Sequence, residues 1–428
     1  MASTYLQRST GTPTSQTKFT VSAWVKRSGL NPSGNNMDIF CIYSDSSNRM
    51  HIRFQEDDID VINYGGSTQA RLTTDRKFRD TNAWYHIVWR VDTTLSTADD
   101  RVRLYINGVQ ETSFSVRTNP SQNFSFGTNW STTRIGTDNS TSYFDGLMSH
   151  FHYSDGYSYG PDTFGSTDST TGEWKINTSP TFTLGNNGFT VLKDGNTITD
   201  QSSNSNDFSV ANGTLTKTED CPSNVFCTMN PLSSISSITF TNGNTGIDYS
   251  SATEMAKGTL HFSSGKFYWE AKLTVDTNYP MIGIGSYDDY RMQSPVATGY
   301  PGAHTNSYGA YGNGNVYANG SNTGSQSFTW ATNDIIGIAV DLDSGTKTIK
   351  WFKNGSQIAT YNITAIAPFS PYDYNGGEAG AGVLYNFGNG YFGTTAVASA
   401  GTNASGVGIF EYNVPAGYTA LSTKGLNL

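Results

Sequence analysis

The chain has 428 residues, which is enough for two ordinary domains that each bury their own core. Its formal net charge is −9 and it shows no basic stripe, which argues against nucleic acid as a partner, because phosphate binding requires clustered cations. No apolar run approaches the roughly 18 residues of a membrane span, and the polar N-terminus is not a secretory signal. We therefore expect synthesis in a cytoplasm and no membrane insertion.

The residue composition favours strands and turns over helices. Only 14% of residues are charged, and the 25 Tyr, 23 Phe and 8 Trp are separated mainly by Ser, Thr, Asn and Gly. Aromatic and β-branched side chains suit a pleated surface, while Asn and Gly suit tight turns. We expect an all-β protein with very little helix.

Alternating apolar residues in the first half predict half-buried strands. Phe19, Val21, Ala23 and Val25 lie two residues apart, and similar rows occupy residues 84–91 and 101–106. Asn107-Gly108 supplies the pair with positive φ that a two-residue hairpin turn requires. We assign a first antiparallel sandwich to residues 1–162.

Residues 163–235 show a weaker apolar pattern and are rich in Ser, Asn, Thr and Asp. Asp194-Gly195 and Asn212-Gly213 mark turns within this stretch. We interpret residues 163–235 as a polar connector with short strands of its own.

The second half repeats the strand pattern in residues 267–275, where apolar residues alternate with polar or amphipathic ones. Ile336, Ile338, Val340 and Leu342 form another buried row, and Asn354-Gly355 predicts a second hairpin turn. These signals assign a second antiparallel sandwich to residues 236–395.

Residues 396–428 are rich in Gly and Ala up to Gly408 and then contain the apolar stretch 409–414. We predict a tail that docks through this stretch as a strand. On this interpretation, truncation after Gly408 leaves two folded modules that no longer enter particles or oligomers.

The first half resembles the laminin G-like, concanavalin A-type jelly rolls. The resemblance is carried by four segments, Phe19-Thr-Val-Ser-Ala-Trp-Val25, Trp84-Tyr-His-Ile-Val88, Val102-Arg-Leu-Tyr-Ile-Asn-Gly108 and Phe144-Asp-Gly-Leu-Met148. It implies a jelly-roll sandwich but says little about the ligand.

The second half resembles SPRY-type sandwiches. The matching segments are Ser264-Gly-Lys-Phe-Tyr-Trp-Glu270, Ile282-Gly-Ile-Gly285, Asp334-Ile-Ile-Gly337, Trp351-Phe-Lys-Asn-Gly355 and Asn386-Phe-Gly388. This resemblance implies a protein-binding platform with variable loops and no catalytic chemistry.

The whole arrangement is similar to tandem-sandwich structural proteins of marine tailed phages, including the segments 199–208 and 420–424. The resemblance implies a tail fibre, a receptor-binding appendage or a capsid decoration on the virion surface. It also implies contacts with other virion proteins, with further copies of the chain, and with a host-surface glycan or protein. A virion component released by lysis also reconciles a polar, outward-facing composition with cytoplasmic synthesis.

Glu56, Asp58 and Asp60 have the i, i+2, i+4 spacing of the catalytic carboxylates in concanavalin-type glycanases. One alternative is therefore a polysaccharide-degrading enzyme, and another is a loop cation site at Asp57 and Asp58. However, the flanking residues 51–54 and 59–62 read as two strands, so Glu56 to Asp58 form the turn between them. We favour a solvated acidic hairpin and a protein that is not an enzyme.

The remaining candidate metal and cysteine sites are weak. His150 and His152 are the only close histidine pair, and no third ligand has a recognisable spacing, so packing is favoured over a metal site. Cys41, Cys221 and Cys227 are too few for a disulfide framework, and free thiols are favoured over a Cys221–Cys227 bridge. We expect no cofactor.

A tyrosine-rich stretch in the second half has the composition of a recognition loop. Tyr offers rigid amphipathic contact area, and the interspersed Ser, Asn and Gly supply adaptable polar groups. The alternatives are a loop that packs on its own sandwich or on a neighbouring subunit, which would suit a purely structural virion protein. The candidate ligand-binding residues are Tyr287, Tyr290, Tyr300, His304, Tyr308, Tyr311 and Tyr317.

Overall fold

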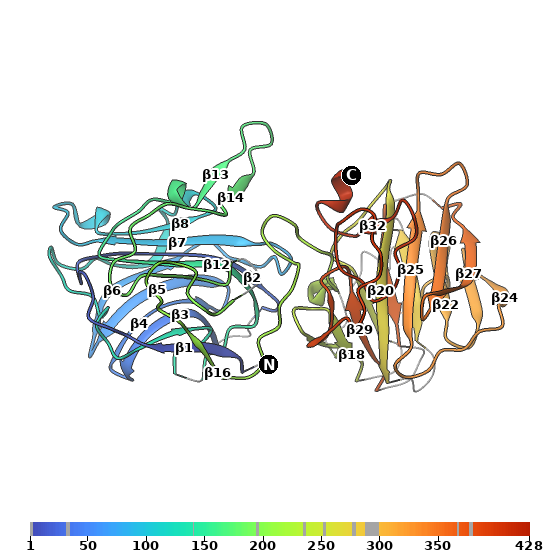
Figure 1. Ribbon diagram of the computed structural model, residues 1–428, viewed down its shortest axis with the longest axis horizontal. Helices are drawn as coiled ribbons and strands as arrows, with labels where there is room; N and C mark the ends of the chain where they lie inside the picture. The colour runs from blue at the N-terminus through green and yellow to red at the C-terminus, as the bar shows by residue number, and fades with distance from the viewer. Residues whose placement is uncertain are drawn as a thin grey trace. The chain divides into compact units, whose positions relative to one another are not determined.

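The computed structural model describes residues 3–30, 35–139, 141–193, 197–233, 237–250, 254–275, 280–286, 299–365, 368–375 and 380–428. The chain divides into two compact units, unit 1 at residues 1–217 and unit 2 at residues 218–428. Each unit is a β-sandwich of two large antiparallel sheets, and many of their strands are labelled in Figure 1. The predicted all-β fold with two sandwiches in tandem is therefore confirmed.

Unit 1 contains an eight-stranded and a six-stranded sheet. The eight-stranded sheet follows the order β10 (Phe114–Thr118), β6 (Thr68–Thr74), β5 (Asp58–Gly65), β4 (Asn48–Gln55), β3 (Asn36–Asp45), β11 (Thr132–Ile135), β1 (Tyr5–Ser9) and β16 (Ser209–Asn212). The six-stranded sheet follows the order β15 (Phe189–Val191), β12 (Gly146–Asp155), β2 (Lys18–Arg27), β7 (Tyr85–Asp92), β8 (Val102–Ile106) and β9 (Val109–Gln110).

The alternation of apolar residues places one face of each sheet in a shared core. Phe19, Val21 and Val25 on β2 are fully buried and face inward, together with Ile87 and Trp89 on β7. The turn at Asn107-Gly108 has positive φ at both residues, as its sequence predicts.

The stretch predicted to be a connector instead belongs to the two sandwiches, because the chain divides between residues 217 and 218. Strand β15 extends the six-stranded sheet of unit 1, and β16 pairs with β1 at the edge of the other sheet. Phe189 and Phe208 enter the core of unit 1 with their rings 4.8 Å apart. This polar stretch is attached to the core of unit 1 by isolated aromatic side chains and not by a row of alternating apolar residues.

A two-stranded hairpin, β13 (Gly165–Thr167) and β14 (Trp174–Ile176), extends from the body of unit 1 (Figure 1). The helical elements in the described part of the chain are short 3-10 turns. They are η1 (Ala98–Asp100), η2 (Pro161–Thr163), η4 (Pro231–Ser233) and η5 (Gly425–Asn427). None of the described helices is long and apolar enough to cross a bilayer.

Unit 2 repeats the arrangement of one eight-stranded and one six-stranded sheet. The larger sheet follows the order β17 (Thr239–Thr241), β18 (Gly246–Asp248), β29 (Gly382–Asn386), β20 (Lys266–Val275), β25 (Ile335–Asp341), β26 (Thr348–Lys353) and β27 (Ser356–Asn362), with β32 (Thr419–Ala420) beside β20. The smaller sheet follows the order β19 (Met255–Lys257), β28 (Phe369–Tyr374), β21 (Met281–Ser286), β22 (Ser307–Tyr311), β23 (Asn315–Ala318) and β24 (Ser321–Ser325). A short hairpin joins β30 (Tyr391–Phe392) to β31 (Thr395–Ala396).

Strand β20 carries the central row of the unit 2 core. Phe267, Trp269 and Leu273 are buried as predicted, whereas Val275 at the end of the strand is 41% exposed. The turn at Asn354-Gly355 again has positive φ at both residues.

The C-terminal segment is an integral part of unit 2, which corrects the prediction of a separate tail. Phe410 and Leu421 are fully buried in the unit 2 core, and β32 pairs with β20 in parallel. Residues 409–414 form no strand, and Ile409 makes one isolated bridge to Asn389. Truncation after Gly408 would therefore remove core side chains from unit 2 instead of leaving two intact modules.

Glu270 on β20 holds this segment in place. Its Oε2 accepts hydrogen bonds from the Glu411 N–H at 2.9 Å and from Asn386 Nδ2 at 3.2 Å. Its Oε1 accepts from the Tyr412 N–H at 2.9 Å and from the Tyr268 hydroxyl at 3.2 Å. Burial raises the pKa of Glu270 to about 7, although the four donors act in the opposite direction.

We expect Glu270→Gln to destabilise unit 2 by about 2–3 kcal/mol, because the new amide NH2 faces donors and leaves buried groups unpaired. Urea unfolding followed by tryptophan fluorescence measures this loss. Glu411→Gln is the matched control, since Glu411 accepts an exposed hydrogen bond from the Ala398 N–H. Equal stability of Glu270→Gln and Glu411→Gln would contradict the anchoring role.

Candidate functional site

The acidic sequence from Glu56 to Asp60 forms a hairpin, as predicted, and not a single strand. Gln55 pairs with Asp58, so Glu56 and Asp57 make the turn between β4 and β5. Glu56 has a φ of 55° in the left-handed region, where the strand alternation is broken. Glu56 therefore does not share a strand face with Asp58 and Asp60.

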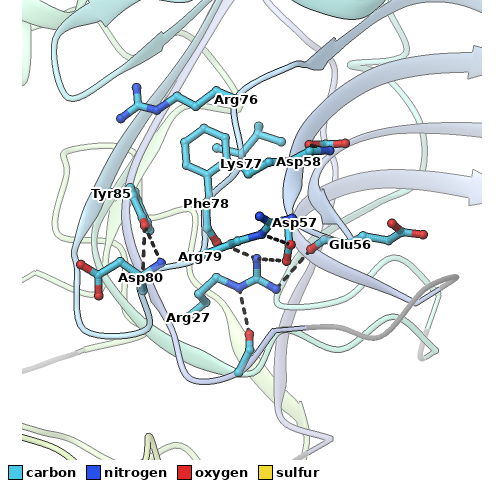
Figure 2. A network of polar contacts seen from close by, with 12 residues as sticks. Arg27, Glu56, Asp57, Asp58, Arg76, Lys77, Phe78, Arg79, Asp80 and Tyr85 are labelled. Carbon is cyan, nitrogen blue, oxygen red and sulfur yellow. Dashed lines mark hydrogen bonds and ion pairs between the residues drawn. The ribbon is translucent and has the colours of Figure 1, made fainter. Parts of the chain in front are cut away.

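The two aspartates at this turn are paired with basic side chains (Figure 2). Asp57 lies 2.7 Å from Arg79 Nε and 3.6 Å from Nη1 of the buried Arg27. Asp58 lies 2.6 Å from Lys77 Nζ. Both aspartates of the predicted loop cation site are therefore engaged by basic side chains.

Asp60 is fully buried on β5, where its carboxylate contacts Arg53 at 2.9 Å, Arg71 at 2.8 Å and the Thr73 hydroxyl at 2.7 Å. Burial acts to raise the pKa of Asp60, but these three partners outweigh it and hold the pKa below its usual value. A carboxylate whose pKa lies below its usual value is ionised at neutral pH, so Asp60 is unsuited to act as a general acid. The acidic hairpin is therefore a structural network.

His150 and His152 also have structural surroundings. His152 is buried, its Nδ1 lies 3.0 Å from the Thr190 hydroxyl, and its ring stacks on Phe164. It borders a pocket of about 250 Å³ whose described lining includes Lys193 but no acidic residue or cysteine. Across the described residues, no group of three or more His, Cys, Asp or Glu side chains is placed to hold a metal ion.

All three cysteines are free, with Cys41 and Cys227 buried and Cys221 partly exposed. The free-thiol interpretation is therefore the one that the structure supports.

Ser22 and His86 form a close serine–histidine pair that the sequence does not reveal. The Ser22 hydroxyl lies 2.8 Å from His86 Nε2, and the indole N–H of Trp174 donates to His86 Nδ1 at 2.9 Å. Because Nδ1 accepts a hydrogen bond from the Trp174 N–H, Nε2 carries the ring hydrogen and donates to Ser22. His86 therefore cannot take a proton from Ser22 through Nε2, and the pair is not a catalytic dyad.

The candidate recognition residues lie in different environments in the structure. Tyr287 and Tyr290 lie outside the described residues. Tyr308 is fully buried, and its hydroxyl accepts from the backbone N–H groups of residues 364 and 365 at 2.9 Å each. This placement corrects the assignment of Tyr308 to a binding surface, because the side chain belongs to the core. His304 is partly exposed in the turn before β22.

The other tyrosines gather on the outer face of the six-stranded sheet of unit 2. The ring of Tyr300 lies 5.1 Å from that of Tyr317 on β23 and 5.9 Å from that of Tyr374 on β28. Tyr311 and Tyr374 both lie opposite Met281 on β21, so they share this face. All four are partly exposed, and we call Tyr300, Tyr311, Tyr317 and Tyr374 the tyrosine cluster.

The backbone that carries Tyr300 is seated on the sheet. Tyr372 donates its hydroxyl hydrogen to the Gly299 carbonyl at 2.9 Å. A Cβ at Gly309 would lie 2.5 Å from Pro301, so the loop approaches β22 as closely as only glycine permits. The backbone at Tyr300 is thus packed directly against the sheet.

Burial and the neighbouring rings raise the pKa of Tyr300 and of Tyr374, so their hydroxyls stay protonated at neutral pH. Tyr374 was not predicted from sequence, although the alternation in Ser370-Pro-Tyr-Asp-Tyr374 indicates that Tyr372 and Tyr374 share a face.

The fold and the cluster together define a class of protein, a tandem β-sandwich whose candidate site offers aromatic and hydroxyl groups for binding. The comparisons with known families agree with this class. Residues 1–157 match the family described as the concanavalin A-like lectin/glucanases superfamily, in its laminin G form. Residues 266–389 match the SPRY domain. Unit 1 is therefore similar to laminin G-like domains and unit 2 to SPRY domains, and the members of both families are typically binding modules.

Solved structures similar to the chain include SPRY domains. The PSpry domain of TRIM65 is 14% identical over 37% of this chain and 88% of its own, with a TM-score of 0.31. The SPRY domain of human HERC1 is 19% identical over 37% of this chain and 96% of its own, with a TM-score of 0.31. No curated protein gives a significant match.

We expect Asp57→Asn to destabilise unit 1 by about 1–3 kcal/mol, because it leaves the buried Arg27 guanidinium without its carboxylate. Asp58→Asn is the matched control, and its loss should stay below about 1 kcal/mol because Lys77 is 46% exposed. Chemical denaturation of the two variants measures the difference. Equal losses would contradict the proposed role of Asp57.

The stability of unit 1 should fall on acidification. Burial lowers the pKa of His86 to about 3, so the folded state holds the neutral ring while the unfolded chain takes up a proton below about 6.5. The contribution of the neutral His86 ring to the stability of unit 1 is complete above about pH 6.5. It is lost as the pH falls towards 3, by at most about 1.4 kcal/mol per pH unit. Urea unfolding at pH 7, 6 and 5 measures this slope. His86→Phe should flatten it, and an unchanged slope in that variant would refute the assignment.

Proposed function

We propose that this protein is a non-enzymatic recognition protein on the surface of a phage particle and that it binds a host-surface glycan or protein. The observation that carries the proposal is the tyrosine cluster, where four partly exposed rings lie on a rigid sheet. Tyrosine loses little conformational entropy on binding and offers both a ring face and a hydroxyl. Sugar rings and protein side chains are both suitable partners for such a surface.

The structural roles of the acidic residues support a binding function over hydrolysis. A retaining glycosidase needs two carboxyl groups about 5–5.5 Å apart, one of which must hold a proton. Asp57, Asp58 and Asp60 are each engaged by basic side chains. The virion location, the association with further copies of the chain and the contacts with other virion proteins rest on the sequence similarity to tandem-sandwich proteins of marine tailed phages.

The binding proposal is tested by applying the purified protein to a panel of isolated bacterial surface polysaccharides and outer-membrane proteins. We expect Tyr300→Ala and Tyr317→Ala to weaken binding about tenfold each, which corresponds to about 1.4 kcal/mol. Tyr157→Ala is the matched control, because Tyr157 is a 39% exposed tyrosine of unit 1. Binding that is unchanged in both cluster variants would contradict the proposed site.

Electron microscopy of intact particles with antibodies against unit 2 tests the location. Labelled outer tips favour host recognition. Particles that label only after disruption would place the cluster at a subunit contact and favour an assembly role instead, and particles without the protein would refute the virion proposal.

A further inference from the structure

A second aromatic surface lies on unit 1, on the outer face of the eight-stranded sheet. Tyr43 on β3 lies opposite Arg49 on β4, and Arg49 lies opposite Tyr64 on β5. Directly paired residues point to the same side of a sheet, with Cβ atoms about 5 Å apart. Their strand neighbours Ile42 and Met50 face the core, so these three side chains face outward.

Arginine and tyrosine alternate along this row. The Arg134 guanidinium of β11 lies 4.9 Å from the centre of the Tyr43 ring, and the Arg49 guanidinium lies 5.7 Å from the centre of the Tyr64 ring. All four side chains are partly exposed. We call Arg134, Tyr43, Arg49 and Tyr64 the arginine–tyrosine stripe.

The charge of the stripe differs from that of the neighbouring arginines on the same face. Arg53 and Arg71 share one carboxylate, that of Asp60, at 2.9 and 2.8 Å. Among the described residues, the hydrogen bonds that Arg134 donates go to neutral acceptors, including Gln7 Oε1 at 3.0 Å and the Asp138 carbonyl at 2.5 Å.

Arg49 is the least satisfied of these arginines. Among the described residues, no hydrogen bond or ion pair reaches it, and its Nε is buried without a partner. Its guanidinium lies over the Tyr64 ring. The stripe therefore holds a cation that no described carboxylate pairs with, on a chain whose net charge is −9.

We propose that the arginine–tyrosine stripe binds an anionic polysaccharide. Guanidinium donors pair with carboxylate or sulfate oxygens in a planar, bidentate geometry. The tyrosine rings present flat faces against which the C–H groups of a sugar can pack. Tyr43 and Tyr64 stand on strands about 10 Å apart, so the stripe is long enough to engage more than one sugar ring.

This site lies on unit 1 and is independent of the tyrosine cluster on unit 2, so either one can fail without the other. The full chain is run in native gels that contain polygalacturonate, dextran sulfate or neutral dextran. We expect at least one of the two polyanions to retard the protein and neutral dextran to have no effect. Retardation by polygalacturonate identifies carboxylate as the recognised group, and retardation by dextran sulfate alone identifies sulfate.

Arg49→Gln and Tyr64→Leu should each raise the polyanion concentration needed for half-maximal retardation about tenfold. Unchanged thermal unfolding of both variants is the check on folding. Arg103→Gln is the matched control, because it removes the same charge from β8 of the other sheet. No retardation by either polyanion, or an equal loss in Arg49→Gln and Arg103→Gln, would overturn the proposal. Stronger retardation by single-stranded DNA than by both polysaccharides would also overturn it, in favour of a nucleic-acid partner.

Discussion

A β-strand presents alternate side chains to opposite faces, so each strand that supplies the core of a sandwich also carries a second row that points away from it. Both units of this protein depend on that constraint. The inner rows supply the two apolar cores. The outer rows must be covered by another part of the chain, made polar, or left for a partner, and the four large sheets differ in which of these applies.

Two of the four outer faces are covered by segments with little strand pattern. On the six-stranded sheet of unit 1, Phe164 and Trp174 pack over Val88 and His86. On the eight-stranded sheet of unit 2, Phe410 packs on Tyr268 at 5.1 Å, and Glu270 holds the adjoining backbone. The buried histidine and carboxylate are therefore explained by covering segments and need no catalytic role.

The other two outer faces carry the candidate sites. The six-stranded sheet of unit 2 bears the tyrosine cluster, and the eight-stranded sheet of unit 1 bears the arginine–tyrosine stripe. Both are rich in rings whose polar ends remain partly exposed. A large aromatic side chain at such a position neither completes the core nor gains the full benefit of burial, which is why these faces are the natural places for a partner.

The strands and hairpins could be predicted from the sequence, because alternating apolar residues and Asn-Gly turns are local signals. The covering segments could not, since Phe189, Phe208 and Phe410 are single anchors in polar surroundings and have no period to detect. The candidate site was predicted in part for a related reason. Tyr308 and Tyr311 look alike in composition, but three residues along a strand reverse the face, so one enters the core and the other joins the cluster.

Two proposed binding surfaces of moderate affinity on one chain would suit a protein that acts in many copies. Each surface consists of a few partly exposed rings, and such contacts are individually weak when no deep pocket removes the ligand from water. If both proposed sites bind, engagement of one gives the second an effective concentration that is set by the connection between the units and not by the bulk ligand. A repeating polysaccharide adds further equivalent sites. On this proposal, affinity would arise from the number of simultaneous contacts, so sandwich faces of modest individual affinity would be sufficient for recognition.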